Sequence, residues 1–150
     1  MKKQRQHSVW ILVGIGVVLV IILSVLIFSG NKQKRIIDFV TDNKTELESI
    51  ALSYLHGDIT TTKYKGVEVD GLYSGEHSIV QFYCSGFGLA PSTKYFGFYY
   101  SEDNIPVAFQ NVDIDLTSTA VDEWIWDDGT DNGGLTKRIT DGWFYFEAWF

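Results

Sequence analysis

One apolar run constrains this 150-residue chain more than any other feature. Residues Val9–Phe28 read VWILVGIGVVLVIILSVLIF, with no charge and with only two glycines and one serine among the apolar side chains. A helix of this length rises about 30 Å, which matches the hydrocarbon core of a bilayer. We therefore expect Val9–Phe28 to be a transmembrane helix, and the lipid bilayer to be the first partner of the chain.

The residues on either side of this run indicate whether it stays in the protein as an anchor and which way it crosses the membrane. The run is longer than the roughly 7–15 apolar residues of a cleaved signal peptide, and no small-residue cleavage site follows Phe28. Each flank carries three Lys or Arg residues, and the α-amino group adds positive charge to the short N-terminal tail. This layout favours a single-pass signal anchor in the cell membrane, with a cytoplasmic N-terminus and the C-terminal domain outside. The inverted topology stays open as an alternative.

Charge divides the chain into segments. We assign residues 1–8 to a basic cytoplasmic tail, residues 9–28 to the transmembrane helix and residues 29–35 to a basic juncture. Residues 36–150 hold six basic and all 19 acidic residues, a net charge of −13. A surface this acidic repels phosphate backbones, so we expect no nucleic-acid partner and favour a basic protein partner. The single cysteine, Cys84, excludes an internal disulfide framework and a thiolate zinc site.

The acidic domain begins with the spacing of an amphipathic helix. Between Ile36 and His56, apolar residues recur mostly at intervals of three and four. A polar stretch at residues 42–44 leaves open whether this is one helix or two. The sequence Thr45-Glu46-Leu47-Glu48 has capping-box spacing and is suited to begin a second helix. A helix with one apolar stripe needs a sheet to bury it.

The remaining sequence predicts strands separated by turn residues. We expect them at Lys63–Val69, Ser78–Ser85, Thr93–Ser101, Ile105–Phe109, Val112–Leu116, Val121–Trp126, Leu135–Thr140 and Trp143–Phe150. Asp141-Gly142 is a strong two-residue hairpin signal, because glycine accepts a positive φ. The expected fold class is α+β, with one amphipathic helix packed on an antiparallel meander sheet of about five to eight strands.

Alternation within the strands sorts their side chains onto two faces. The apolar set Phe144, Phe146 and Ala148 suits the face beneath the helix. The second face is aromatic and mixed, and its tyrosines include Tyr83 and Tyr95. The candidate partner- or ligand-binding residues on this face are Trp124, Trp126, Trp143, Tyr145, Glu147 and Trp149.

A single helix covers only one face of the sheet, so three arrangements are possible for the second face. It is closed by the sheet curling into a second small core, covered by a partner, or exposed as a binding surface. Exposed aromatic patches mark interaction sites, and Trp and Tyr are enriched among the residues that dominate binding energy.

No motif for catalysis or for a cofactor is complete. The loop Asp127–Gly134 is acidic and glycine-rich, as calcium loops are. Counted from Asp128, however, position twelve is Ile139, where such a loop needs a bidentate glutamate. We expect a solvated hairpin loop there and keep calcium binding as an alternative. We expect no catalytic residue, no metal and no cofactor, and therefore a protein that is not an enzyme.

Together these features predict a membrane-anchored protein with a small acidic extracytoplasmic binding domain. We expect it to act as a protein-interaction or neutralising accessory module of the bacterial envelope. Acidic charge steers a basic partner, and the aromatic face supplies affinity. One alternative is a cell-surface polysaccharide-binding module that stacks sugars on Trp143, Tyr145 and Trp149. Another is a cytoplasmic adaptor, if the topology is inverted.

Overall fold

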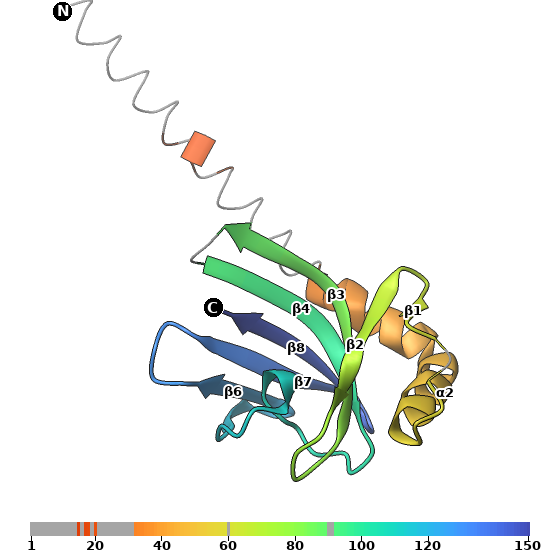
Figure 1. Cartoon of the computed structure of the whole chain (residues 1–150). Coiled ribbons are helices and arrows are strands. Elements are labelled where there is room, and N and C mark those ends of the chain that lie inside the picture. Colours follow the sequence, from red (N-terminus) through yellow and green to blue (C-terminus); the bar gives the residue numbers. More distant parts are fainter. Residues whose placement is uncertain (1–14, 16, 19, 21–31, 60, 90–91) are drawn as a thin grey trace, which may run out of the picture. The chain divides into compact units, whose positions relative to one another are not determined.

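The structure, a computed structural model, describes residues 15, 17–18, 20, 32–59, 61–89 and 92–150 (Figure 1). The chain divides into two compact units, Met1–Arg35 and Ile36–Phe150. Within the predicted transmembrane segment, Ile15, Val17, Val18 and Val20 are helical and exposed, and the rest of Val9–Phe28 lies outside the described residues. Across the residues that are described, no helix is both long enough and apolar enough to span a membrane.

The amphipathic segment forms two helical elements rather than one. Residues 32–42 are helical, Asn43 is in a turn, and α2 spans Lys44–Leu55. The Asn43 amide donates to the Phe39 carbonyl at 2.7 Å, and its oxygen accepts a hydrogen bond from Lys65 Nζ at 2.6 Å. The break between the helices is thus tied to the hairpin that follows them. Because α2 begins at Lys44, the predicted capping box lies inside its first turn.

Eight antiparallel strands form a single sheet in the order β1-β2-β3-β4-β8-β7-β6-β5. Their bounds are β1 Lys63–Tyr64, β2 Val67–Tyr73, β3 Ile79–Leu89, β4 Ser92–Ser101, β5 Thr117–Ala120, β6 Glu123–Asp127, β7 Gly133–Thr140 and β8 Trp143–Trp149. The α+β class and the antiparallel pairing are confirmed. The sheet consists of two meanders, β1–β4 and β5–β8, joined where β4 pairs with β8, so the single meander that was expected is corrected.

Two predicted strands are absent from this sheet. Residues 102–116 connect β4 to β5, and both Ile105–Phe109 and Val112–Leu116 lie outside the ladders. The short 3-10 turn η1, Phe109–Asn111, interrupts this connection. The connection packs on the sheet through Val107, Ala108, Phe109, Ile114 and Leu116. From Val112 to Leu116 apolar and acidic residues alternate, so this part has the period of a strand without the hydrogen bonding of one.

Turn positions account for the other differences. The predicted strand Lys63–Val69 is divided by a tight turn at Lys65 and Gly66, whose φ angles are 46° and 89°. The hairpin predicted at Asp141-Gly142 is confirmed, and Gly142 has a φ of 78°. Glycine adopts this left-handed conformation without the steric penalty that a Cβ imposes.

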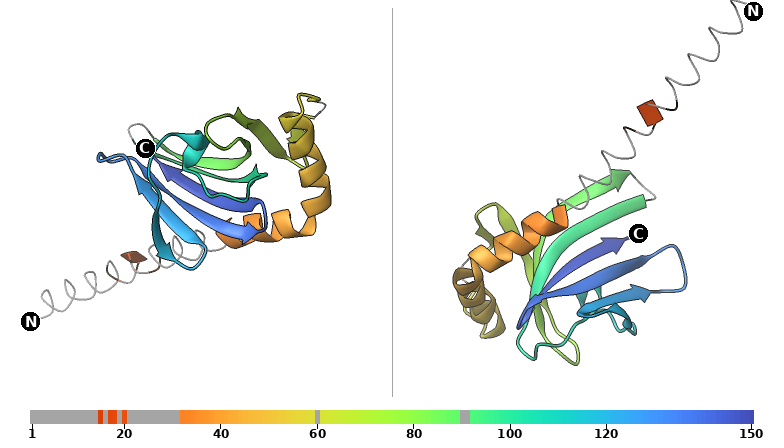
Figure 2. Two further views of the ribbon diagram at one scale, coloured as in Figure 1. Left: turned by 90° about the horizontal axis from the view of Figure 1, so that it is seen from below. Right: turned by 180° about the vertical axis from the view of Figure 1, so that it is seen from behind.

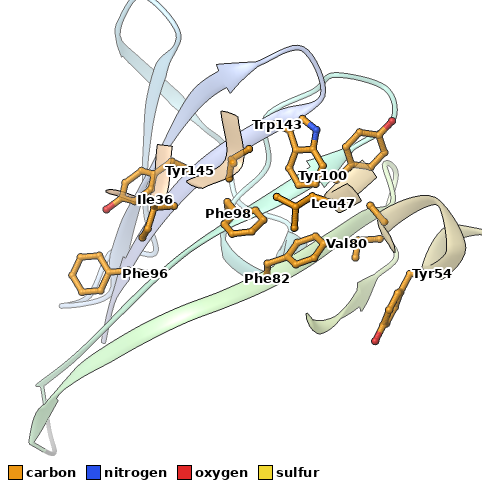
Figure 3. Close-up of a cluster of buried hydrophobic side chains, with 12 residues drawn as sticks. Ile36, Leu47, Tyr54, Val80, Phe82, Phe96, Phe98, Tyr100, Trp143 and Tyr145 are labelled. Atoms are coloured by element: carbon orange, nitrogen blue, oxygen red, sulfur yellow. The ribbon is translucent and has the colours of Figure 1, made fainter. Parts of the chain in front are cut away.

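The helical elements cover one face of the sheet and form the main core with it (Figure 2). Leu47 and Ala51 of α2 are fully buried there. On the sheet, Phe82 of β3 stacks on Phe98 of β4 with ring centroids 4.8 Å apart, and Trp143 lies 5.8 Å from both rings (Figure 3). The aromatic rings of three neighbouring strands therefore fill the space beneath the helices.

β8 turns the opposite set of side chains toward this core from the set that was expected. Phe98 pairs with Tyr145, and Tyr99 pairs with Phe144. Residues directly opposite each other in an antiparallel pair project to the same face. Tyr145 therefore joins Phe98 beneath the helices, and Phe144 joins Tyr99 on the second face. The prediction was wrong because alternation shows which residues share a face, whereas strand register decides which face that is.

The connection 102–116 covers the second face of the sheet. Val107 packs with Ile79, Tyr99, Phe144 and Phe146 in a second core. A third small cluster joins Ala108 to Trp126 and Ala148. Much of the second face is therefore a second core, closed by a segment of the same chain rather than by curling of the sheet.

Candidate functional site

Three of the six predicted binding residues are buried. Trp143 and Tyr145 are 0% and 2% exposed beneath the helices, and Trp126 is 4% exposed in the third cluster on the opposite face. Trp143 and Tyr145 were predicted to lie on the second face, and the register of β8 with β4 places them in the main core instead. They contribute to packing and offer little surface to a partner.

The other three candidates are half-buried and lie apart. The Trp124 ring packs on Phe144 and lies 5.8 Å from the Arg138 guanidinium. Glu147 and Trp149 lie near the end of β8, where Lys94 Nζ is 2.8 Å from the Glu147 carboxylate and 5.7 Å from the Trp149 ring. The six residues thus do not form one continuous surface.

Two cavities flank residues 107–111 of the connection on the second face. The first, which we call the aromatic cleft, has a volume of about 470 Å³ and is lined by Asp70, Tyr83, Thr93, Tyr95, Phe109, Gln110 and Phe150. The second, the acidic groove, has a volume of about 480 Å³. Both lie within the size range of small-ligand sites.

Four aromatic rings line the aromatic cleft. Tyr95 is central, with its ring centroid 5.8 Å from Phe109, 5.8 Å from Phe150 and 6.4 Å from Tyr83. The Phe109 ring is nearly parallel to Tyr95, at 21°, whereas the Phe150 ring meets Tyr95 at 69°. The rings therefore present both faces and edges around one cavity.

A hydrogen-bond network fixes the polar side of the cleft. Asp70 Oδ2 accepts from Gln81 Nε2 at 2.7 Å and from the Tyr73 hydroxyl at 3.0 Å. Gln81 is 1% exposed, and its Oε1 accepts the Gln110 backbone N–H at 3.1 Å. One buried glutamine thus holds both the carboxylate of the cleft and the loop opposite it.

The loop beside the cleft has an unusual backbone. Gln110 and Asn111 are consecutive non-glycine residues with a φ of 55°. Such conformations cost free energy and persist where surrounding contacts hold them. The Asn111 amide donates to the His77 carbonyl at 2.6 Å, and Gln110 Nε2 donates to the Tyr73 hydroxyl at 3.0 Å. The contacts that hold this loop also shape the cleft.

The electrostatic environment of the cleft is negative. The pKa of Tyr83 is raised, first by burial and then by neighbouring groups that include Tyr95, Glu68 and Asp70. Burial, the first cause, disfavours a charge of either sign, whereas the carboxylates of Glu68 and Asp70 disfavour a negative charge in particular. The two carboxylates, rather than the burial, attract a cation.

The acidic groove combines carboxylates with apolar side chains. Glu76, Asp113 and Asp115 line it together with apolar residues that include Val112 and Ile114. Among the described residues, none of these three carboxylates forms an ion pair, whereas four of the six basic residues of the domain do. The groove therefore carries uncompensated negative charge beside apolar surface.

The acidic loop Asp127–Gly134 uses its oxygen atoms internally. Asp128 accepts hydrogen bonds from the Thr130 backbone and hydroxyl and from the Asn132 amide. The hydrogen bond from the Thr130 side chain is the main reason that the pKa of Asp128 is lowered. Within the described part of the chain, no group of three His, Cys, Asp or Glu residues is placed to hold a metal ion.

Sequence reasoning identified part of the aromatic cleft. Alternation placed Tyr83 and Tyr95 together on the second face, as the structure does. It missed Asp70, which lies beyond the end of the predicted strand, and Phe109, which was assigned to a strand of its own. The signal for Phe109 was the turn-prone Asn111 that follows it by two residues.

Comparison with known proteins adds no assignment. No family model matches the chain, and no curated protein and no solved structure matches it either.

Proposed function

We propose that this chain is a single-pass membrane protein that displays residues 36–150 outside the cell as an acidic domain for binding basic proteins. The apolar run Val9–Phe28 and the basic residues before it support the anchor and its orientation. The net charge of −13 in residues 36–150 supports a positively charged partner. In this role the domain tethers or neutralises its partner at the membrane surface of a bacterial envelope.

The acidic groove is the observation that carries the proposal. Its carboxylates at Glu76, Asp113 and Asp115 are exposed and have no cationic partner among the described residues. Apolar side chains at Val112 and Ile114 lie in the same cavity. Lysine and arginine suit such a surface, because they combine a charged head with an apolar stem.

The arrangement favours protein binding over the polysaccharide alternative. A sugar-stacking platform at Trp143, Tyr145 and Trp149 needs exposed ring faces, and two of these rings are buried. The Trp149 ring that is left has the Lys94 ammonium 5.7 Å from its centroid. We propose a binding protein without catalytic activity, because the sequence contains no complete catalytic motif.

Binding of a labelled ten-residue lysine peptide tests the proposal. The full-length chain is held in an uncharged polyoxyethylene detergent, and the groove is neutralised by Glu76→Gln, Asp113→Asn and Asp115→Asn together. Each exposed pair contributes about 0.5 kcal/mol, so we expect the affinity to fall about tenfold. A glutamate peptide of equal length serves as the probe of opposite charge and is expected not to bind.

The matched control removes the same charges elsewhere. Asp42→Asn, Glu46→Gln and Asp58→Asn are the same chemical changes at exposed positions outside both cavities. We expect this variant to bind the lysine peptide nearly as well as the unmodified chain. Equal losses in the two triple variants would contradict a localised site and leave only a general charge effect.

Topology is tested separately. A tag is placed after Phe150, protease is added to intact cells, and the tag is then detected by immunoblot. The immunoblot of untreated cells also shows whether the anchor is retained. Loss of the tag supports display outside the cell. Protection until lysis contradicts it and turns the proposal into a cytoplasmic adaptor.

A further inference from the structure

We infer that the aromatic cleft is a receptor for a lysine side chain of the basic partner. Asp70 pairs with the lysine ammonium group. The rings of Tyr83, Tyr95, Phe109 and Phe150 contact the alkyl stem and attract the positive charge. This inference rests on the proposed function and goes beyond it. It names a chemical group and a second cavity, distinct from the acidic groove.

The rings supply the first part of the argument. Aromatic faces attract a cation that lies within about 6 Å of the ring centroid. The centroid of Tyr95 is within 6.4 Å of three neighbouring rings, so a cation in contact with one ring is close to others. Because the rings are inclined at 21° to 69° to Tyr95, they border the cavity from more than one direction.

Asp70 supplies the second part. Among the described residues, the hydrogen bonds to its carboxylate come from Gln81 and Tyr73, and both end on Oδ2. These bonds hold the carboxylate in place and leave Oδ1 for a ligand. Asp70 is the one lining residue of the cleft with a charged side chain, so the cavity carries negative charge without an internal cation.

The chemistry of the cleft discriminates among ligands. An anion is repelled by Asp70. A neutral apolar side chain desolvates this carboxylate without compensating it, which is unfavourable. An alkylammonium ion satisfies both parts of the site, because its charge pairs with Asp70 while its methylene groups contact the rings.

Hydrogen bonds within the chain itself shape the cleft. Gln81 joins Asp70 to the Gln110 backbone, and Tyr73 bonds both the Asp70 carboxylate and the Gln110 side chain. The left-handed backbone at Gln110 is therefore held by contacts within the chain itself. A preformed site avoids much of the ordering cost of binding, which favours recognition of a single side chain.

Ring resonances of the full-length chain test the inference. Tyrosines labelled with carbon-13 in the ring are observed in the polyoxyethylene detergent while Nα-acetyl-lysine methylamide is added. We expect the Tyr83 and Tyr95 signals to shift, and the signal of Tyr99 in the second core to stay constant. The neutral analogue, Nα-acetyl-norleucine methylamide, is expected to bind about tenfold more weakly.

Asp70→Asn is the decisive variant. The amide oxygen still accepts the hydrogen bonds from Gln81 and Tyr73, while the charge is lost. We expect lysine affinity to fall about tenfold. Asp58→Asn makes the same change at an exposed position outside the cleft and is expected to leave lysine affinity unchanged. An unchanged Tyr99 signal in both variants shows that the second core is intact.

Three results would overturn the inference. These are equal binding of the norleucine analogue, the absence of shifts at Tyr83 and Tyr95, and equal losses in Asp70→Asn and Asp58→Asn. The outcome is separable from that of the proposed function. If the lysine peptide still binds at the acidic groove while the cleft signals do not respond, only the inference about the cleft fails.

Discussion

The Tyr99 hydroxyl holds the connection 102–116 on the sheet, and its removal has a calculable effect. It accepts the Val107 N–H at 2.8 Å and donates to the Val107 carbonyl at 3.2 Å, and both residues are buried. In Tyr99→Phe the Val107 carbonyl keeps a second partner, the Thr136 hydroxyl at 3.0 Å. The Val107 N–H loses its hydrogen-bond acceptor. A buried donor left unpaired costs about 1–3 kcal/mol, and we expect a loss near the middle of that range.

Thermal unfolding and hydrogen exchange measure this loss. For a domain of this size, about 2 kcal/mol lowers the Tm by roughly 8 °C. We also expect the Val107 amide to exchange faster with solvent, because its protection depends on the connection staying closed.

The neighbouring tyrosine is the matched control. Tyr100 is 8% exposed, and among the described residues its hydroxyl has no hydrogen bond like those between Tyr99 and Val107. Tyr100→Phe is expected to change the Tm by less than about 2 °C. The reasoning is refuted if the two substitutions have equal effects, or if Tyr99→Phe leaves both the Tm and the exchange of Val107 unchanged.

Other substitutions test the packing and the assignments. Trp143→Ala is expected to cost about 3–5 kcal/mol in a denaturant titration, and Trp149→Ala less than half of that, because only the first ring is buried in the core. Gly97→Ala should prevent native folding, seen as protease sensitivity, because a Cβ there would lie 2.1 Å from a backbone oxygen. Burial raises the pKa of Cys84 to about 12, so alkylation at pH 8 should be slower by about a thousandfold than in the unfolded chain. Stability from this thiol is complete below its unfolded pKa near 9 and is lost as pH rises toward 12. Calcium and chelator should leave the Tm unchanged, because the loop Asp127–Gly134 bonds its own oxygens.

Local patterns in the sequence predicted those parts of the fold that depend on neighbours in the chain. The apolar spacing from Ile36 onward predicted helical structure, and the turn at Asp141-Gly142 predicted the β7–β8 hairpin. The pairing of β4 with β8 was beyond such patterns. It joins two strands that are separated in the sequence by the connection 102–116 and by β5, β6 and β7, and it determines which face Trp143 and Tyr145 occupy.

The connection between the meanders shows a second limit. Val112, Ile114 and Leu116 alternate with acidic residues, as in a half-buried strand. Ile114 and Leu116 pack against the third cluster, while Asp113 and Asp115 are exposed. Alternation shows that one side of a segment is buried and the other exposed, but it does not show ladder hydrogen bonds, so this segment was assigned to a strand.

The candidate site could be predicted only in part for the same reason. Tyr83 and Tyr95 lie on adjacent strands, so alternation brought them together. Asp70 and Phe109 reach the cleft through a bulged strand and through a left-handed turn, respectively. Neither a bulge nor a left-handed turn produces a regular spacing of apolar residues, so the periodicity of the sequence does not predict it.

The pairing of β4 with β8 also sets the timing of folding. β4 lies at the middle of the sheet, and its partner is the last strand of the chain, so β1–β4 is synthesised with one edge of β4 unpaired. That edge and the aromatic rings beside it stay open to wrong pairings until Trp143–Trp149 arrives. Closure over so long a stretch of chain is slow. A sheet built in this way becomes native only once its final strand has been made, and until then it depends on protection of the open edge of β4.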